Sequence, residues 1–595
     1  MIFGKHINKY YLKYAWLLTL GIMSLFLVDY MQLKVPEFYR MTANGLNTGT
    51  AIVNGATVKF DMNVLLDEIC MPLILVILCM ITGRFIWRIC FFGAGNRLAA
   101  SMRGELFAHC RELSQNFYSR NKVGDLMSLY TNDMETIEEC FKWGILMFVD
   151  AVSLGIMAMI KMFRVNPVLT LAVLCPMGLL LAVTLILKKL MTGKWDARQA
   201  AFSKLSDFSQ ESFSGISVIK AFVTEMKEIK AFDEINKTNE DTNVDYTKIS
   251  TLLKVLVRLF IETSFGIIFG IGGILVFKGK IDAGQLIEFS GYFDAIIWPV
   301  TAVSELVDQS SRGKASLIRI SKILDEPVDV KDREGITVPD KEIEGKIEFR
   351  GLTFAFPGTN HNALENITLT IEKGENIGII GKTGCGKTTL CDLILRTYNV
   401  PYGTLLVDDI DVNDLPIEYL RTYEAYVPQD NFLFSDTIAN NVAFAVDDKN
   451  IEKIKESADI SDVAKDIEEF PHKYKTVLGE RGVTVSGGQK QRISIARAVM
   501  KDAPIMILDD SVSAVDTDTE KRILGKLKAL RSGKTTILIE HRVSTVMNMD
   551  KIIYMNDGKV VDFGSHDELY ERCEEYRRTC DLQNFMNEKG GDLNA

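Results

Sequence analysis

Six long apolar stretches occupy the first half of this 595-residue chain. They cover about residues 15–36, 69–92, 143–163, 167–187, 257–277 and 283–304. Each approaches the ~20 residues that an α-helix needs to cross the hydrocarbon core of a bilayer. Such segments fold as helices, because a backbone in lipid must satisfy its hydrogen bonds internally. The sequence therefore predicts a six-helix transmembrane domain over residues 15–312 rather than a soluble helical core.

The connections between these stretches alternate between short and long. Residues 164–166 separate the third and fourth stretches, and residues 278–281 separate the fifth and sixth. The long connections, about 93–142 and 188–256, carry many Lys and Arg residues, which places them on the cytoplasmic side. They contain no proline and hold mixed charges at helical spacing. We therefore expect the transmembrane helices to continue far into the cytoplasm.

A polar region follows the sixth stretch. Residues 313–345 contain Pro327 and Pro339 and are expected to form a linker. From 346 to 580, short apolar runs alternate with helical patterns, which predicts an α/β domain. Residues 581–595 are polar and are expected to form a flexible tail. The predicted fold is an all-α transmembrane domain with long cytoplasmic helix extensions, followed by an α/β domain.

The start of the chain and its charge bear on location and partners. Lys5, Lys9 and Lys13 stand among aromatic residues, so we expect residues 1–14 to form a basic amphipathic segment on the inner membrane face. This predicts a plasma-membrane protein whose termini and α/β domain are cytoplasmic. The net charge is −10, whereas nucleic-acid-binding surfaces are basic. The lipid bilayer, and not nucleic acid, is therefore the expected partner.

A glycine-rich loop lies between an apolar run and a helical pattern in the α/β domain. It consists of Gly381, Lys382, Thr383, Gly384, Cys385, Gly386, Lys387, Thr388 and Thr389. In this context backbone N–H groups converge on phosphates, and the helix N-terminus adds positive potential. We expect Lys387 to contact the β- and γ-phosphates of a nucleotide and Thr388 to offer its hydroxyl to Mg²⁺. The thiol of Cys385 is expected to be exposed when no nucleotide is bound.

Two adjacent carboxylates end a later apolar run. Residues 505–508 are all apolar and are followed by Asp509 and Asp510. A carboxylate at the end of a buried strand can orient Mg²⁺ beside the phosphates. Asp509 is therefore a second candidate ligand for Mg²⁺, together with Thr388.

Further motifs occur in both halves of the chain. In the second half they are Phe356 before Pro357, Gln429 in Tyr426-Val427-Pro428-Gln429-Asp430, Gly479-Glu480-Arg481-Gly482, Ser486-Gly487-Gly488-Gln489, Asp516 in Ser513-Ala514-Val515-Asp516, and His541 in Glu540-His541-Arg542. In the first half they are residues 117–126 with 131–133, and residues 214–222. On these motifs the chain resembles an ABC transporter of the exporter type over nearly its whole length.

The resemblance implies a role for each motif. Phe356 would stack on adenine, which needs only a π face. Gln429 would ligate Mg²⁺, Asp516 would belong to the D-loop, His541 would be the switch histidine, residues 479–482 the X-loop, and the two membrane-half motifs the coupling helices. Ser486-Gly487-Gly488-Gln489 would be the signature that contacts ATP held by the opposite subunit. The implied function is ATP-driven export of a small amphipathic molecule, lipid or peptide by alternating access.

One residue departs from the efficient members of this family. They carry glutamate where this chain has Asp510, and the shorter side chain loses roughly 1–1.5 Å of reach, enough to cost about a hundredfold in rate. In heterodimeric exporters, a subunit with this aspartate often keeps a good signature, as this chain does apart from Val485. We therefore expect a second half-transporter as partner. A homodimer with a tolerated aspartate remains open because His541 is retained, as does a non-transporting ABC sensor.

Acidic residues in the transmembrane stretches are candidates for substrate contact, because charges in a membrane are costly and usually functional. Glu262 lies four residues after Arg258, so these two can pair on one helix face. The other acids could line a cavity for a cationic or amphipathic substrate, or could pair between helices with Lys142 or Lys161. These candidates are Asp29, Asp150 and Asp294.

Overall fold

The computed structural model describes residues 3–53, 56–479 and 485–591. Contacts divide the chain into two compact units. The helical unit comprises residues 1–108 and 124–325, and the α/β unit comprises residues 109–123 and 326–595. A short piece of the first long connection thus belongs to the α/β unit.

The helical unit contains six segments that are long and apolar enough to cross a membrane, counted over the described residues. They run over Ala15–Thr48, Met62–Glu112, Val123–Val165, Pro167–Thr184, Glu225–Phe277 and Ala283–Leu324. The prediction of six transmembrane helices is confirmed. The helices are α1 (Asn8–Lys13), α2 (Ala15–Gln32), α3 (Val35–Thr48), α4 (Met62–Val64), α5 (Met71–Glu112), α7 (Val123–Ser128), α8 (Met134–Val165), α9 (Pro167–Ser214), α10 (Ile216–Ala221), α11 (Glu225–Phe277) and α12 (Ala283–Leu324).

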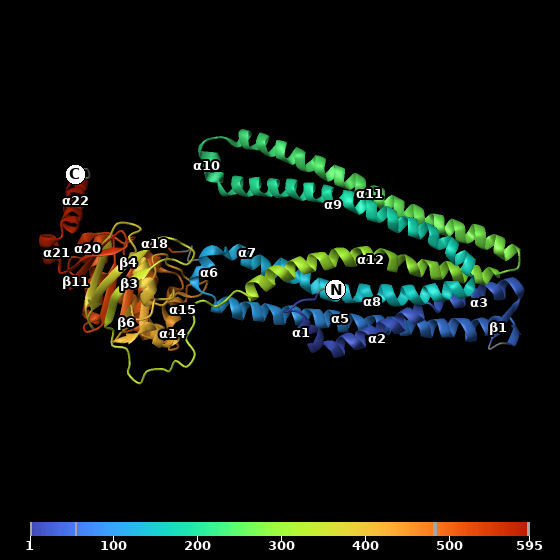
Figure 1. Ribbon diagram of the computed structural model, residues 1–595, viewed down its shortest axis with the longest axis horizontal. Helices are drawn as coiled ribbons and strands as arrows, with labels where there is room; N and C mark the ends of the chain where they lie inside the picture. Colours follow the sequence, from blue (N-terminus) through green and yellow to red (C-terminus); the bar gives the residue numbers. More distant parts are fainter. Residues whose placement is uncertain (1–2, 54–55, 480–484, 592–595) are drawn as a thin grey trace. The chain divides into compact units, whose positions relative to one another are not determined.

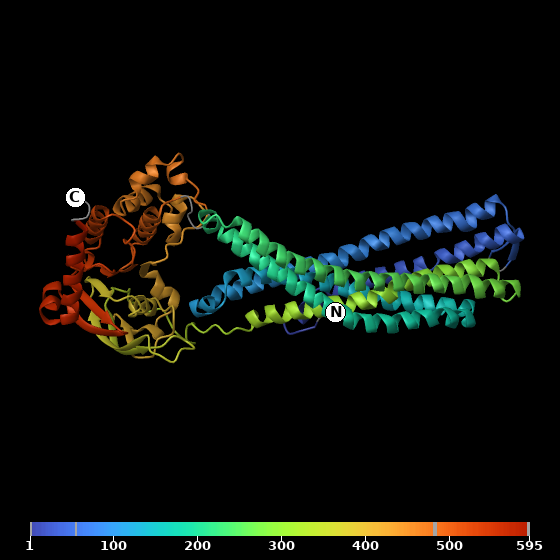
Figure 2. The same ribbon diagram turned by 90° about the horizontal axis from the view of Figure 1, so that it is seen from above.

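The two long connections between the apolar stretches are helical, as predicted. Helices α9 and α11 have 48 and 53 residues and lie side by side, and the six-residue helix α10 joins them (Figures 1 and 2).

Each short connection ends in a residue that caps the start of the next helix. The Asn166 side chain accepts a hydrogen bond from the Leu169 N–H at 3.0 Å, and Asp282 and Gln285 form a capping box at the start of α12.

Two boundaries differ from the sequence prediction. The expected linker over 313–345 begins as helix, because α12 continues to Leu324. The polar last turns of α12 are held by Asp133, which accepts hydrogen bonds from Ser316 at 2.7 Å and from the Arg319 Nε at 3.1 Å. The first span also continues past residue 36, and a hairpin of β1 (Thr50–Val53) and β2 (Ala56–Lys59) follows it.

The α/β unit contains two sheets. One is six-stranded in the order β12-β11-β5-β10-β9-β8, with all neighbours parallel except β11 and β12. The other is four-stranded and antiparallel, in the order β4-β3-β6-β7. The strands are β3 (Ile347–Phe354), β4 (Leu364–Ile371), β5 (Asn376–Gly381), β6 (Leu405–Val407), β7 (Ile410–Asp411), β8 (Glu424–Val427), β9 (Ile505–Asp509), β10 (Thr535–Ile539), β11 (Lys551–Asn556) and β12 (Lys559–Gly564).

The helices of this unit surround the sheets. They are α6 (Gln115–Arg120), α13 (Lys387–Ile394), α14 (Ile417–Thr422), α15 (Ile438–Val442), α16 (Ile451–Ile460), α17 (Ala464–Glu469), α18 (Gly487–Lys501), α19 (Thr517–Leu530), α20 (Val543–Val546), α21 (His566–Arg572) and α22 (Glu574–Gly591). The last of these corrects the prediction of a flexible tail, since the chain is helical through Gly591.

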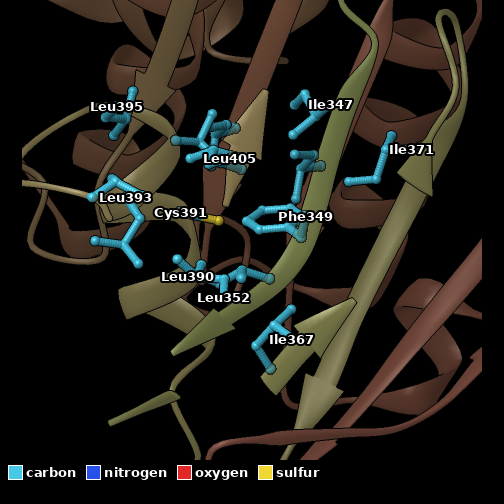
Figure 3. Close-up of a cluster of buried hydrophobic side chains, with 14 of the residues drawn as sticks. Ile347, Phe349, Leu352, Ile367, Ile371, Leu390, Cys391, Leu393, Leu395 and Leu405 are labelled. Carbon is cyan, nitrogen blue, oxygen red and sulfur yellow. The ribbon is translucent and has the colours of Figure 1, made fainter. Parts of the chain in front are cut away.

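The largest core of the α/β unit packs the antiparallel sheet against α13 (Figure 3). Phe349 and Leu352 of β3, Ile367 of β4, and Leu390 and Leu393 of α13 are at most 1% exposed. Residues of β3 alternate between buried and exposed on either side of an irregularity between Phe349 and Leu352, as expected for a strand with one buried face. This packing fixes the start of α13, which is the end of the glycine-rich loop.

Candidate nucleotide-binding site

Three neighbouring parallel strands end at the same edge of the six-stranded sheet. Strand β5 leads into the glycine-rich loop, β9 ends at Asp509, and β10 leads into His541. The register pairs Ile539 of β10 with both Ile379 and Asp509. Because parallel strands present their carboxyl ends together, this edge is where a ligand binds in such sheets. The glycine-rich loop, Asp510 and His541, the two residues predicted to be catalytic, are thus brought together.

The glycine-rich loop requires glycine at two positions for different reasons. A Cβ atom on Gly381 would lie 2.2 Å from the Met555 carbonyl oxygen, so there is no room for a side chain. Gly386 has φ +98°, a backbone conformation that other residues rarely adopt. The Lys387 ammonium donates to the carbonyls of Gly381 and Lys382 at 2.9 and 3.1 Å, which holds its charge over the loop. These features give a cradle for phosphate.

A cavity of about 550 Å³ opens beside the loop. Most of the predicted site residues line it, and they come from several elements of the α/β unit. They are Phe356, Thr383, Gly384, Gly386, Lys387, Thr388, Thr389, Gln429, Asp509, Asp510 and His541. The sequence prediction missed further lining residues, among them His361, Asn362, Asp557 and Gly558. They lie in turns at the edges of the two sheets and form no recognisable motif.

Phe356 is held as an adenine platform would need to be. Its ring packs edge-on against Phe354 and Tyr398, with centroids 5.3 Å apart in each pair. The backbone around it forms a turn, in which the Phe356 carbonyl accepts the Thr359 N–H at 3.0 Å. The adjacent Pro357 carbonyl accepts a hydrogen bond from Arg120 at the end of α6.

The Cys385 thiol is buried, so the expectation of an exposed thiol is wrong. Its side chain is 3% exposed and belongs to the core beneath the loop. Burial raises the pKa of this thiol. The loop turns its backbone toward the cavity, and the Cys385 side chain therefore points inward.

Asp509, Thr388 and Gln429 are suited to hold Mg²⁺. Asp509 is 1% exposed, and burial raises its pKa although a hydrogen bond with Thr388 opposes that shift. Its second carboxyl oxygen, Oδ2, has no hydrogen-bond partner among the described residues. A buried carboxylate oxygen with an unused lone pair, next to a hydroxyl and an amide, is an oxygen ligand set of the kind that Mg²⁺ prefers.

Asp510 directs its side chain into the cavity. The Gln429 Nε2 lies 3.4 Å from the Asp510 Oδ2, and the Asp510 N–H donates to the Ile539 carbonyl at 3.0 Å. Gln491 of α18 donates to the Asp510 carbonyl at 3.2 Å and accepts the Ala514 N–H at 2.9 Å. Asp510 has φ +47°, which aspartate tolerates better than most residues.

The signature residues lie at the start of α18. Ser486 and Gln489 form a capping box, with the Gln489 N–H donating to the Ser486 Oγ at 3.2 Å. Ser486 and Gly487 are exposed, and in the described part of the chain none of the four signature residues lines the cavity beside the loop. Gly488 packs on the D-loop, where an added Cβ would lie 2.9 Å from the Ala514 carbonyl oxygen.

The other predicted loops are placed as follows. Asp516 caps α19 by accepting the Thr519 N–H at 2.9 Å, and this hydrogen bond lowers its pKa. In the predicted X-loop, residues 480–482 lie outside the described residues. The first predicted coupling segment begins in α6 of the α/β unit and continues into α7 of the helical unit, and the second forms α10 in the helical unit.

Sequence reasoning also missed a buried acidic residue next to His541. Glu540 is 2% exposed, and its Oε1 has no hydrogen-bond partner among the described residues. Burial and the nearby charge of Asp510 raise its pKa to about 8. The signal that could have found it is its position, since a carboxylate ends the apolar run of β10 as Asp509 ends that of β9.

The three acids proposed for substrate contact have different surroundings. Asp29 of α2 is 1% exposed and accepts a hydrogen bond from Ser153 of α8. Asp150, one turn earlier on α8, accepts from the indole of Trp298. Asp294 of α12 is exposed. These are contacts between helices, and none of the three is paired with a lysine in the described structure.

The lysines expected as interhelical partners are bound elsewhere. Pairing with these lysines is therefore wrong, although Asp29 and Asp150 do make contacts between helices. The pairing of Arg258 with Glu262 is confirmed at 3.8 Å. Lys142 pairs with Glu138, and Lys161 pairs with Glu37.

Comparison with known proteins agrees with this geometry. The family profile of the ABC transporter transmembrane region matches residues 38–300, and the ABC transporter profile matches residues 364–513. A probable multidrug resistance ABC transporter ATP-binding/permease protein, YheI of Bacillus subtilis strain 168, is 33% identical over 591 residues, which is 99% of this chain and 98% of YheI. The multidrug resistance-like ATP-binding protein MdlA of Escherichia coli K12 is 34% identical over 571 residues, 96% of this chain and 95% of MdlA.

A solved structure shows the same fold. It is a bacterial Atm1-family ABC exporter with ATP bound, at 22% identity and a TM-score of 0.74, with 97% of this chain and 98% of that chain covered. Six membrane-crossing helices, a phosphate loop with its carboxylates, and relatives that match end to end lead to one assignment. The chain belongs to the ABC transporter family and is an integral membrane exporter that binds ATP and couples its hydrolysis to transport.

Proposed function

We propose that this chain is one half of a heterodimeric exporter, whose own ATP site turns over slowly and whose signature completes the partner's site. The proposal rests on two features that occur together in this chain. Asp510 stands at the position of the catalytic carboxylate, and the signature is intact, with Ser486 capping α18. An aspartate reaches roughly 1–1.5 Å less far than a glutamate, and catalysis is sensitive to misplacement on that scale. The signature needs no such carboxylate, so it can serve another site fully.

The residues of this site divide into holding and acting groups. Lys387 and the loop N–H groups hold the phosphates, and Phe356 stacks on adenine. Mg²⁺, when bound by Thr388, Gln429 and Asp509, would neutralise charge on the β- and γ-phosphates. Asp510 would accept the proton of the attacking water.

The exposed position of Ser486 and Gly487 supports action across an interface. Two ATP molecules would be sandwiched between facing ATP domains on the cytoplasmic side, each held by one subunit's loop and the other's signature. Closure of this sandwich would open the transmembrane cavity outward, and hydrolysis at the competent site would reset it.

The assembly can be tested by expressing the chain alone and together with the neighbouring half-transporter reading frame. We expect the purified single chain to hydrolyse ATP at least about tenfold more slowly than the two-chain assembly, because only the latter contains a competent carboxylate. Steady-state ATPase assays on equal amounts of detergent-purified protein measure this difference. Vigorous activity from the single chain would favour the homodimer, with which the retained His541 is consistent. ATP-dependent substrate flux distinguishes both assemblies from a sensor.

The proposed substrate is a small amphipathic or cationic molecule. The relatives described as multidrug resistance proteins support this class, and a relative described as an ATP-dependent lipid A-core flippase, of Pseudoalteromonas translucida, supports lipids as well. Asp150 and Asp294 are the candidate contacts that the helices do not bury, and a carboxylate attracts a cation more strongly in a low-dielectric setting.

We therefore expect Asp150→Asn combined with Asp294→Asn to reduce ATP-dependent uptake of a cationic dye into inside-out vesicles by about fivefold or more. Uptake of a neutral dye should change little. Glu262→Gln is the matched control, because this exposed acid already pairs with Arg258. If the double variant takes up the cationic dye at the wild-type rate, these acids do not contact substrate.

A further inference from the structure

The C-terminal helix contacts the loop that carries the switch histidine. The Gln583 Nε2 of α22 donates to the His541 carbonyl at 2.8 Å, and the Gln583 Oε1 accepts the Val543 N–H at 2.8 Å. One side-chain amide thus uses its donor and its acceptor on the backbone on both sides of Arg542.

The Val543 N–H needs a hydrogen-bond acceptor from outside its own helix. Val543 is the first residue of α20, and its N-cap residue, Arg542, makes no capping hydrogen bond with its side chain. The first N–H groups of a helix have no acceptor within the helix, so an acceptor from outside stabilises the start of the helix. Gln583 supplies this acceptor from a different helix, so the start of α20 is fixed by α22.

Gln583 is itself held in place by the packing of its helix. It follows Cys573, which directly precedes α22, and Tyr576 and Cys580, which lie on the same face of α22 as Gln583 because the spacings are four and three residues. Cys573, Tyr576 and Cys580 are at most 6% exposed and belong to the core under the parallel sheet. The Tyr576 hydroxyl lies 2.8 Å from the His566 Nδ1. The amide is therefore presented from a rigid element.

We infer that Gln583 is a positioning residue for His541 and that α22 is in this way part of the ATP site. The imidazole of His541 lines the cavity beside the phosphate loop, while its carbonyl is held from behind by Gln583. Without this hold the loop gains freedom and the imidazole is less often aimed at the phosphates. The inference rests on the proposed role of His541 as the switch residue.

The test measures single-turnover hydrolysis of radiolabelled ATP and ATP affinity on the full-length chain purified alone, in which every ATP site is built from this chain. Gln583→Met keeps the side-chain length and removes both hydrogen bonds. Gln583→Glu keeps the acceptor for the Val543 N–H and places a carboxylate oxygen against the His541 carbonyl. Asn584→Ala, on the exposed side of the same helix, is the control.

We expect Gln583→Met and Gln583→Glu to lower the single-turnover rate about tenfold with ATP affinity nearly unchanged, since misaimed groups cost rate more than binding. Gln583→Met should also lose a little thermal stability, because it removes the acceptor at the start of α20. Asn584→Ala should match the wild type. A wild-type rate for Gln583→Met, or equal losses of rate and thermal stability in all three variants, would overturn the inference.

A double-mutant cycle with His541→Ala separates positioning from general support. If Gln583 acts through His541, Gln583→Met should add nothing in the His541→Ala background, because coupled residues are not additive. Additive losses would show that Gln583 acts by another route. If His541→Ala alone leaves the rate unchanged, the proposed role of His541 fails and the inference fails with it. If His541→Ala slows turnover and Gln583→Met does not, only the inference fails.

Discussion

Asp510→Glu is expected to raise ATP turnover at this chain's own site by about ten- to a hundredfold. The added methylene restores roughly 1–1.5 Å of reach toward the attacking water, and errors of about 1 Å can cost a hundredfold in rate. The surroundings are ready for it, since Gln429 and Gln491 already contact the Asp510 side chain and carbonyl. Single-turnover hydrolysis on the variant and on the wild type measures the gain.

Two controls make this prediction sharp. Asp510→Asn keeps the size of the side chain and removes its basicity, so it should lower the already slow turnover further. Glutamate tolerates the left-handed backbone at this position, φ +47°, less well than aspartate, so thermal stability must be measured alongside. A well-folded Asp510→Glu variant with unchanged turnover would show that reach is not what limits this site.

Gly488→Val is expected to reduce the ATPase activity of the two-chain assembly by about a hundredfold, while Asp510→Asn in the same chain changes it less than about twofold. A side chain at 488 would press on the Ala514 carbonyl, 2.9 Å from the added Cβ, and would obstruct the exposed start of α18. The partner's competent site would then lose its phosphate contacts from this chain, and losing a single such donor costs about a hundredfold or more.

The matched control is Gly525→Val in α19, a helical glycine whose Cβ would meet nothing within 4 Å. It tests whether valine in a helix of this domain is harmful in itself. Steady-state ATPase activity of the assembly is the measurement. If Gly488→Val and Asp510→Asn were equally damaging, the two ATP sites would be equivalent and the unequal-site proposal would fall.

The sequence predicted much of the fold because its signals were long or repeated. The six apolar stretches and the two charged, proline-free connections each extend over about twenty residues or more. A few atypical residues therefore do not obscure these patterns. The missed boundaries depend on single tertiary contacts. Helix α12 continues through polar residues because Asp133, far away in sequence, binds Ser316 and Arg319. Helix α22 continues past residue 580, where Gln583 hydrogen-bonds to the backbone at His541 and Val543, and a glutamine in a polar segment looks like surface.

The candidate site shows the same division. The phosphate loop, Asp509 and His541 follow strands in the order that the chemistry requires, so the sequence places them directly. Glu540 and Gln491 have no motif of their own, and their significance comes from burial or from backbone groups that folding brings near them. The orientation of Cys385 was predicted wrongly because a loop motif does not indicate which side chains turn inward.

The paired helices α9 and α11 have a mechanical consequence. From Glu225 to the predicted membrane entry near residue 257, α11 projects roughly 50 Å at about 1.5 Å per residue, braced along its length by α9. A tilt of about 10° at the membrane would move the connecting helix α10 by roughly 9 Å, by the geometry of a straight rod of that length. The pair therefore works as a lever arm, which converts a small angular change among the transmembrane helices into a stroke longer than a full helical turn.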